Sequence, residues 1–486
     1  MNANLIRSAI HVAAVCGMYL ATAMLLPALV DLYYRDDHWR VFAVSAFMTG
    51  GISLLTATAT RGAPPPFSKR FGFILVNVLW IVFSIAGVVP IYFSSLGLTF
   101  GQAIFEAVSA VTTTGSTSIS GLDAMPKGLL MWRSLLHWLG GIGIVALGLF
   151  ILPFLRVGGM SFFRMESSDN TSDRPFARLA TFTRAFIAIY VGATALCAVA
   201  YDIGGMTRFD AINHAMSTIS TGGFSTHDAS FGNFGDNRFL LWTATFFMLL
   251  GSLPFSIMIL FAVRRRVDTL RDPQIVVFLG YVCVFSILAA VYNHLKNGVD
   301  FGYALTHSFF NFASIFSTTG FASEDYTQWG AFVVAASFIA TFMGGCSGST
   351  SGGIKAYRFV ILFQTVHVGL KKLIYPDAVY SVRYGRLTVD AETQKSVLVF
   401  FFAFVFIWAM GSLAMGALGY DIATSLSSVL TALANVGPGV GNVIGPAGNF
   451  SAMNDPAFYL LSFLMLLGRL EVLSVMVLLL PTFWRN

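Results

Sequence analysis

Residues 105–117 read FEAVSAVTTTGST, and three similar stretches follow further along the chain. They read AINHAMSTISTGGFS (211–225), SFFNFASIFSTTGFA (308–322) and SSVLTALANVGPGVG (427–441). Each opens with a segment compatible with a helix and ends in Ser, Thr or Asn followed by glycine. The aligned glycines are Gly115, Gly223, Gly320 and Gly437, separated by 108, 97 and 117 residues. A repeat at such long intervals indicates four copies of one unit, each made of a span, a half-helix and a second span.

The composition is that of an all-α polytopic membrane protein. Of the 486 residues, 56% are hydrophobic and only 11% are charged, and the mean hydropathy is +0.74. A soluble protein of this length could not solvate such a surface. Apolar runs near the length needed to cross a bilayer recur along the chain, and we expect about ten spans. They lie roughly at 8–30, 40–60, 71–93, 129–153, 181–201, 239–263, 274–295, 329–345, 396–418 and 457–480.

The basic residues are distributed unevenly between the two sides of the predicted bundle. The net charge is +6, and most Lys and Arg residues lie in four segments between spans, at 61–70, 156–184, 264–271 and 355–395. By the positive-inside rule, these segments and both termini are cytoplasmic. The distribution accounts for the positive charge without nucleic acid, and we expect no nucleic-acid partner.

The four half-helices lie on the side opposite the basic segments. Non-helical backbone at membrane depth is tolerated only where it is buried in protein or lines a water-filled path. Four re-entrant half-helices can surround one axis, each with its partially negative C-terminal end pointing inward. Beyond that end we expect Thr-Thr-Gly backbone in an extended form, with glycine allowing successive carbonyls to face the axis. A ring of carbonyl oxygens can replace the water shell of a monovalent cation.

The sequence therefore predicts a cation selectivity filter with three residues from each repeat. They are Thr113, Thr114, Gly115, Thr221, Gly222, Gly223, Thr318, Thr319, Gly320, Asn435, Val436 and Gly437. The alternative is that the four stretches are ordinary external loops rich in Ser, Thr and Gly. Four matching copies on one side of the bundle argue against that alternative.

A second unusual stretch, GGCSGSTSGGIK at 344–355, follows the apolar run VVAASFIATFM. In the second repeat the run at 239–263 reads as uninterrupted at the matching place, so we expect only the third repeat to break its helix. Small residues there would form a flexible plug beneath the carbonyl ring. The alternatives are a helix contact through small residues or a loop at the membrane edge. The predicted gating loop comprises Gly344, Gly345, Cys346, Ser347, Gly348, Ser349, Thr350, Ser351, Gly352, Gly353 and Lys355.

Arg469 falls near the centre of the last predicted span, with Glu471 two residues further on. A charge at that depth is costly and usually faces a cavity or a partner. Because residues two apart on a helix point to different faces, Arg469 and Glu471 are not expected to pair with each other. We expect Arg469 to line the cavity below the filter as a barrier to cations. The alternative is a structural pair between helices, which is the expectation for Glu471.

Together these motifs resemble those of the Trk/Ktr/HKT superfamily of potassium transporters, and in particular its bacterial TrkH/TrkG branch. The resemblance implies a pseudo-four-fold pore in one chain, in the cytoplasmic (inner) membrane of a bacterium, with K⁺ as the transported substrate and no covalent cofactor. It identifies the aligned glycines as filter residues, and Lys355 and Arg469 as basic residues near the gating loop. It also implies a homodimer that binds a cytosolic, nucleotide-binding RCK-type subunit, similar to TrkA, on its basic face. The second segment reads STGG and the fourth NVGP, so the ring is not four-fold identical.

The repeat divides the chain into five parts. They are two leading transmembrane helices (1–66), pore repeat 1 (67–160), pore repeat 2 (161–268), pore repeat 3 with the gating loop (269–388) and pore repeat 4 (389–486).

Three other functions remain to be weighed against potassium uptake through a gated pore. The chain could be the potassium-translocating subunit of an ATP-driven pump, which requires a partner ATPase. It could be a proton-coupled symporter, for which Glu471 and Glu106 are the candidate carboxylates. A membrane enzyme is disfavoured because the sequence has no HExxH motif and no paired embedded carboxylates, and His137 and His214 are isolated.

Overall fold

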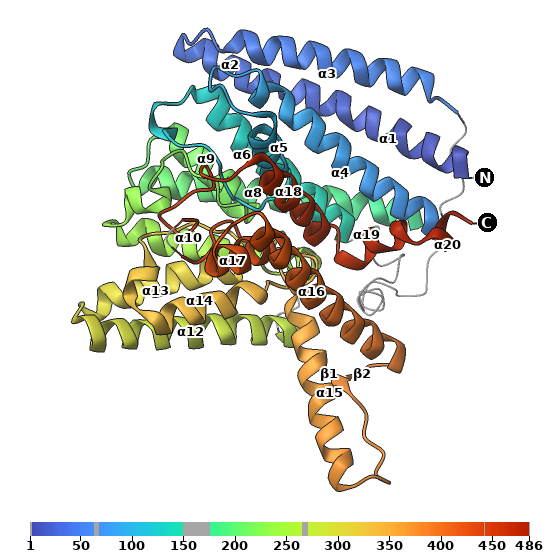
Figure 1. The fold of residues 1–486 in the computed structure, drawn as a ribbon, viewed down its shortest axis with the longest axis vertical. Helices are drawn as coiled ribbons and strands as arrows, with labels where there is room; N and C mark the ends of the chain where they lie inside the picture. The colour runs from blue at the N-terminus through green and yellow to red at the C-terminus, as the bar shows by residue number, and fades with distance from the viewer. Residues whose placement is uncertain (1, 63–67, 149–174, 265–270, 442, 486) are drawn as a thin grey trace.

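The computed structural model describes residues 2–62, 68–148, 175–264, 271–441 and 443–485 (Figure 1). These residues are mostly helical; a short antiparallel hairpin pairs β1 (Arg383–Tyr384) with β2 (Leu387–Thr388). The predicted boundaries at 66/67, 160/161 and 268/269 lie outside the described residues, as do most of the basic segments at 156–184 and 264–271.

Among the described residues, seven spans have the length and apolar character needed to cross a membrane. The first combines α1 (Asn2–Ala23) and α2 (Leu25–Tyr34). The other six are α3 (Trp39–Ala59), α4 (Lys69–Tyr92), α6 (Lys127–Ala146), α8 (Pro175–Ile203), α12 (Pro273–Asn297) and α16 (Ala391–Ala417). The chain is therefore a multi-span membrane protein, as its composition predicts.

Two pairs of helices, each joined at a sharp bend, are long and apolar enough to cross a membrane only if the pair is taken together. They are α10 (Arg238–Gly251) with α11 (Phe255–Arg264), and α18 (Asp455–Arg469) with α19 (Val472–Leu479). The predicted span at 329–345 forms helix only in α14 (Ala331–Phe342), whose 12 residues are too few to cross a bilayer alone. The chain then leaves the bundle in α15 (Ala356–Ile374), and it ends in the short α20 (Pro481–Trp484).

The prediction that residues 239–263 run without interruption is wrong. α10 ends at Gly251, α11 begins at Phe255, and their axes differ by 95°. Pro254 has no N–H to continue a helical ladder. The carbonyls of Gly251 and Ser252 instead accept hydrogen bonds from the backbone N–H groups of Thr350 (3.2 Å) and Cys346 (3.0 Å).

The related expectation, that only the third repeat is broken, is also wrong. α18 and α19 meet at 110°, and Glu471 at their junction has a left-handed φ of 63°. A bent helix leaves backbone groups unpaired, which is tolerated at membrane depth only where other protein groups or water satisfy them. At the first bend, the stretch 344–355 supplies those groups.

A short helix follows each of the long helices α4, α8, α12 and α16: α5 (Phe100–Val111), α9 (Arg208–Ile219), α13 (Phe301–Phe316) and α17 (Ile422–Ala434). Each begins in the same way, because a Thr or Asp side chain at the N-cap accepts a backbone N–H from the first turn. The capping residues are Thr99, Thr207, Asp300 and Asp421. The predicted helix-compatible stretches are therefore helices with local start signals.

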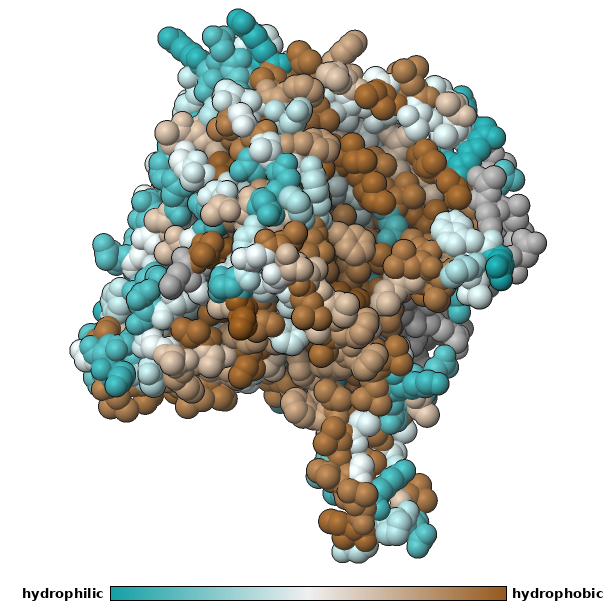
Figure 2. Space-filling view, viewed as in Figure 1, coloured by the Kyte–Doolittle hydropathy of each residue, from teal (hydrophilic) through white to brown (hydrophobic). Residues whose placement is uncertain are grey.

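The outer surface is apolar over wide areas, as Figure 2 shows for one face. Phe47 on α3 and Phe402 on α16 are 84% and 75% exposed. The arm formed by α15 and the hairpin projects from the body in Figure 1 and also exposes apolar side chains, such as Leu373. Contiguous apolar surface of this extent is typical of contact with membrane lipid.

Candidate functional site

The four short helices end in one shared backbone conformation. One or two residues after each helix ends, a residue has a left-handed φ between 50° and 58°: Thr113, Thr221, Thr318 and Asn435. The N–H of this residue donates to the carbonyl three positions earlier, and the N–H of the next residue donates to the carbonyl five positions before it. In the first segment, Thr113 N–H donates to the Ala110 carbonyl and Thr114 N–H donates to the Ser109 carbonyl. This is a Schellman cap with Thr or Asn where glycine is usual.

The prediction of an extended Thr-Thr-Gly backbone is wrong. Two residues after each left-handed Thr or Asn, the aligned glycine again has a positive φ, between 82° and 108°. An extended strand has negative φ throughout. Two left-handed residues separated by one other residue are therefore incompatible with a regular extended strand.

The aligned glycines place the four segments in a closed ring. A Cβ atom built on each glycine would lie against the carbonyl oxygen of the middle residue in the following segment, and the fourth segment meets the first. The pairs and their Cβ-to-oxygen distances are Gly115 and Gly222 (2.3 Å), Gly223 and Thr319 (1.8 Å), Gly320 and Val436 (2.0 Å), and Gly437 and Thr114 (2.8 Å). Glycine is required here twice over, by the positive φ and by the neighbouring oxygen. The structure thus brings the four predicted filter segments into one ring, through the glycine and the middle residue of each.

Side chains join the last segment of the ring to the first. The amide of Asn435 donates to Thr114 Oγ1 at 2.9 Å and Ser116 Oγ donates to the Gly437 carbonyl at 2.7 Å. In the second segment, Gly222 has no side chain because His137 lies there: a Cβ would be 2.1 Å from His137 Nδ1. The histidine ring stacks on Phe224 at 4.1 Å. The four-fold pattern is therefore closed but chemically uneven.

The stretch 344–355 lies directly against this ring. Gly352 N–H donates to Thr318 Oγ1 at 2.6 Å, and Thr221 Oγ1 donates to Thr350 Oγ1 at 3.1 Å. Thr350 Oγ1 also contacts the carbonyls of Ile219 and Gly251, at 3.1 and 2.9 Å. The loop therefore contacts the second and third segments and the bend between α10 and α11 at once.

The other loop residues are held by the surrounding helices. Tyr281 on α12 donates its hydroxyl to the Gly344 carbonyl at 2.5 Å, and the Gln274 side chain accepts the Ser347 N–H at 2.9 Å. Gly348 accepts the Phe255 N–H at 3.0 Å. The remaining contacts lie within the loop or with its neighbours: Gly345 with Ala356, Ser349 with Cys346, Ser351 with Ser252, Gly353 beside Gly344, and Lys355 Nζ with the Ser351 carbonyl.

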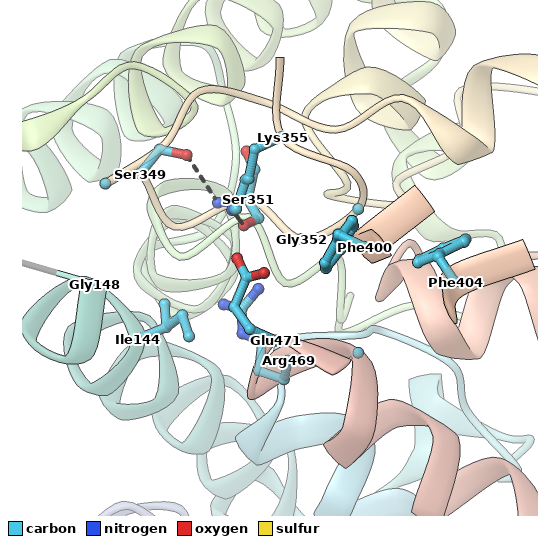
Figure 3. A pocket seen from close by; sticks show the side chains of 13 residues that line it. Ile144, Gly148, Ser349, Ser351, Gly352, Lys355, Phe400, Phe404, Arg469 and Glu471 are labelled. Atoms are coloured by element: carbon cyan, nitrogen blue, oxygen red, sulfur yellow. Dashed lines mark hydrogen bonds between the residues drawn. The ribbon is translucent and has the colours of Figure 1, made fainter. Parts of the chain in front are cut away.

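A small cavity lies beside the loop, and Figure 3 shows the side chains around it. Ser349, Ser351, Gly352 and Lys355 border it from the loop. The end of α6, α16 and the α18–α19 junction supply Ile144, Gly148, Phe400, Phe404, Arg469 and Glu471. Hydroxyl, ammonium, guanidinium and carboxylate groups thus meet in a buried space beneath the ring.

Arg469 and Glu471 have different partners in this space. Arg469 Nη2 donates to the Thr350 carbonyl at 2.7 Å, and its Nε and Nη1 have no hydrogen-bond partner among the described residues. Glu471 pairs with Arg358 on α15 at 2.5 Å, which confirms the expected pair between helices. The Arg358 guanidinium also lies 3.6 Å from the centre of the Phe400 ring. At the bend between α18 and α19, Arg469 therefore contacts the loop, whereas Glu471 contacts α15.

Sequence reasoning missed three groups at this site. Gly251 and Ser252 had a local signal, since Pro254 follows them inside the apolar run. Gln274 had none, because its contact with Ser347 joins two segments 73 residues apart. His137 was taken as an isolated structural residue, and only its position behind Gly222 relates it to the ring.

The chain is similar to known cation transport proteins along most of its length. The chain matches the TrkH family of cation transport proteins over residues 40–283 and 274–485. It is 41% identical over 477 residues to the Trk system potassium uptake protein TrkI of Halomonas elongata, covering 98% of this chain and 96% of that protein. It is 37% identical over 469 residues to the Trk system potassium uptake protein TrkH of Salmonella typhimurium, covering 95% and 96%.

A solved structure is similar over the whole length of the chain. The crystal structure of the potassium transporter TrkH from Vibrio parahaemolyticus matches with a TM-score of 0.90 and 33% identity, covering 99% of each chain. The family consists of transport proteins rather than enzymes. The chain belongs to the TrkH family of cation transport proteins.

Proposed function

We propose that the chain mediates potassium uptake across the cytoplasmic membrane through a pore at the centre of the ring. The observation that carries the proposal is the closed set of glycine-to-carbonyl contacts between successive segments. Carbonyl oxygens arranged in this way can take the place of a hydration shell. The relatives named as potassium uptake proteins support K⁺ as the ion. Membrane voltage, about 2.3 kcal/mol per charge per 100 mV, drives a cation inward without further coupling.

The stretch 344–355 is the gate in this proposal. It lies against Thr221 and Thr318 and rests on the bend at Gly251. Its backbone is held by hydrogen bonds from several helices, so a small displacement of any of them changes its position. Arg469 adds a positive charge to the same space, which raises the free energy of a cation there.

Regulation from the cytosol has a physical route in the described residues. The Tyr384 hydroxyl of the hairpin donates to Asp272, and Asp272 caps α12 by accepting the Gln274 N–H at 2.9 Å. Gln274 in turn accepts the Ser347 N–H of the loop. In this proposal a nucleotide-binding RCK-type subunit docks on the basic cytoplasmic face of a homodimer and shifts the hairpin, with both termini on that side.

The two competing transport mechanisms are less well supported. A proton-coupled symporter needs a carboxylate that can gain and lose a proton, yet Glu106 and Glu471 are both in buried ion pairs, with Arg133 (2.7 Å) and Arg358 (2.5 Å). An arginine within hydrogen-bond distance stabilises the charged carboxylate. A pump subunit would require ATP hydrolysis by a partner, and the voltage-driven pore needs no such step.

The test is cation flux into liposomes that contain the purified chain, under an imposed voltage. K⁺, Rb⁺, Na⁺ and Li⁺ are measured separately, and K⁺ and Rb⁺ are expected to pass. Deleting residues 344–352 should raise the flux if the loop is the gate. Gln274→Ala should change how strongly an added cytosolic partner alters the flux. Absence of any flux without ATP would refute the free-standing pore.

A further inference from the structure

Each pore helix carries a polar residue nine positions before its aligned glycine. These residues are Glu106, His214, Asn311 and Ser428. The first three bind the chain where it leaves the ring: Glu106 accepts the Ser118 N–H (3.0 Å), His214 Nε2 contacts Ser225 Oγ (3.0 Å), and Asn311 accepts the Ser323 N–H (3.1 Å). In the first three pore helices this residue therefore binds the segment that follows the aligned glycine. Glu106 is the only carboxylate among the four residues.

Arg133 on α6 completes the arrangement around Glu106. Its Nε donates to Glu106 Oε1 at 2.7 Å, and its Nη2 donates to Thr117 Oγ1 at 3.1 Å. Both charged side chains are buried, with 1% and 0% exposure for Arg133 and Glu106. A buried pair of this kind is costly to desolvate and is stable only when its remaining hydrogen-bonding groups are satisfied.

The third nitrogen of Arg133 reaches the second segment. Nη1 donates to the Ser225 carbonyl at 3.3 Å, and the guanidinium lies 4.0 Å from the centre of the Phe224 ring. Phe224 and Ser225 directly follow Gly223. The Arg133 side chain thus joins Thr117, just after the first ring segment, to Ser225, just after the second.

We propose that Arg133 and Glu106 are positioning residues that set the ion selectivity of the filter, an inference that rests on the proposed function. Neither is expected to touch the ion. The planar guanidinium has donors in a fixed geometry, so it holds Thr117 and Ser225 at a set separation. That separation constrains the contact between Gly115 and the Gly222 carbonyl, because these residues lie only two and three positions before Thr117 and Ser225 in the chain. A looser contact lets the oxygens adapt to cations other than K⁺.

The test compares K⁺ and Na⁺ flux for variants that keep the fold. Removing one partner alone would leave a buried charge unpaired, whereas replacing both by neutral residues of similar volume is often tolerated. The main variant is therefore Glu106→Gln with Arg133→Met. Arg133→Lys is the second variant, because it keeps the charge next to Glu106 and loses the fork that reaches Thr117 and Ser225.

Asp31→Asn is the matched control. Asp31 is a buried carboxylate that accepts the Gly128 N–H at 2.5 Å, so it acts on the first turn of α6, five residues before Arg133, and not on the ring. All variants are compared for elution profile and thermal unfolding before flux. The control should lower the unfolding temperature and leave the K⁺-to-Na⁺ flux ratio unchanged.

We expect the double variant to conduct K⁺ with a K⁺-to-Na⁺ flux ratio at least threefold lower than that of the wild type. The flux ratio of Arg133→Lys should fall between the two. An unchanged ratio in Arg133→Lys and in a folded double variant would overturn the inference, since the pair would then be structural only. The proposed function would survive that result if Gly115→Ser still lowered the ratio. A wild-type protein that does not distinguish K⁺ from Na⁺ would refute the proposed function, and this inference with it.

Discussion

Replacing each aligned glycine by alanine in turn should lower the preference for K⁺ over Na⁺ in a fixed order. The order follows from the distance between the new Cβ atom and the carbonyl oxygen of the next segment. That distance is 1.8 Å at Gly223, 2.0 Å at Gly320, 2.3 Å at Gly115 and 2.8 Å at Gly437. We expect the largest loss of preference at Gly223 and the smallest at Gly437.

The magnitude comes from two costs. A close carbon-to-oxygen contact is roughly 3.3 Å, so the neighbouring carbonyl must move by about 1.5 Å at Gly223 and by about 0.5 Å at Gly437. A residue with a Cβ also pays about 1–2 kcal/mol for a left-handed backbone. If the ring relieves this strain by displacing the carbonyl, K⁺ binding loses a comparable free energy, which corresponds to a factor of about 5–30.

The assay is the K⁺-to-Na⁺ flux ratio of each variant in liposomes at equal protein content. Gly121→Ala is the matched control, because Gly121 has a φ of 81° and no atom within 4 Å of its Cβ position. It should lose stability from the same backbone strain and keep the wild-type ratio. Equal ratios for all four ring variants, or an inverted order, would show that the ring contacts do not set selectivity.

Three other changes have expected outcomes. Arg469→Gln removes a positive charge beneath the ring and should raise cation flux several-fold at the same voltage; unchanged flux would contradict a barrier there. Glu471→Gln leaves Arg358 buried without its carboxylate and should lower the free energy of unfolding by about 3–5 kcal/mol, most of which Arg358→Met in the same protein should restore. The nearby carboxylates of Asp210 and Asp123, the second of which is hydrogen-bonded to the imidazole, raise the pKa of His227. The charged His227 therefore stabilises the fold fully below about pH 6.5, its ordinary value, and this contribution is lost as the pH rises through the raised pKa. Thermal unfolding across that range should show the loss in the wild type and a smaller dependence in His227→Gln.

Local signals were enough to predict much of the architecture. The apolar runs gave most spans, because a bilayer requires a minimum length of apolar helix. The four Thr/Asn-to-Gly steps were visible because each is a short contiguous pattern, and the ring is built from them. The same patterns did not reveal the backbone conformation, since Thr113 and its counterparts adopt left-handed angles that such residues rarely take.

The bends show where hydropathy averaged over a window fails to predict the shape of a span. Residues 239–263 are apolar throughout, so their hydropathy indicates a span whether or not the helix is straight. Pro254 was the warning, but a proline can also be accommodated in a membrane helix when neighbours satisfy the freed carbonyls. Here the freed carbonyls accept hydrogen bonds from a loop more than 90 residues away in the chain. The axes of α10 and α11 differ by 95° at that point.

The sequence alone therefore determined the four glycine-ended segments and their place in a membrane protein, because each rests on residues close together in the chain. Only the tertiary structure decided which groups meet. The pairing of Glu106 with Arg133, the reach of Arg133 to Ser225, and the separate partners of Arg469 and Glu471 all join segments that are distant in sequence. Such contacts depend on how four units close around one axis, and the geometry of that closure is a property of their packing that no single stretch encodes.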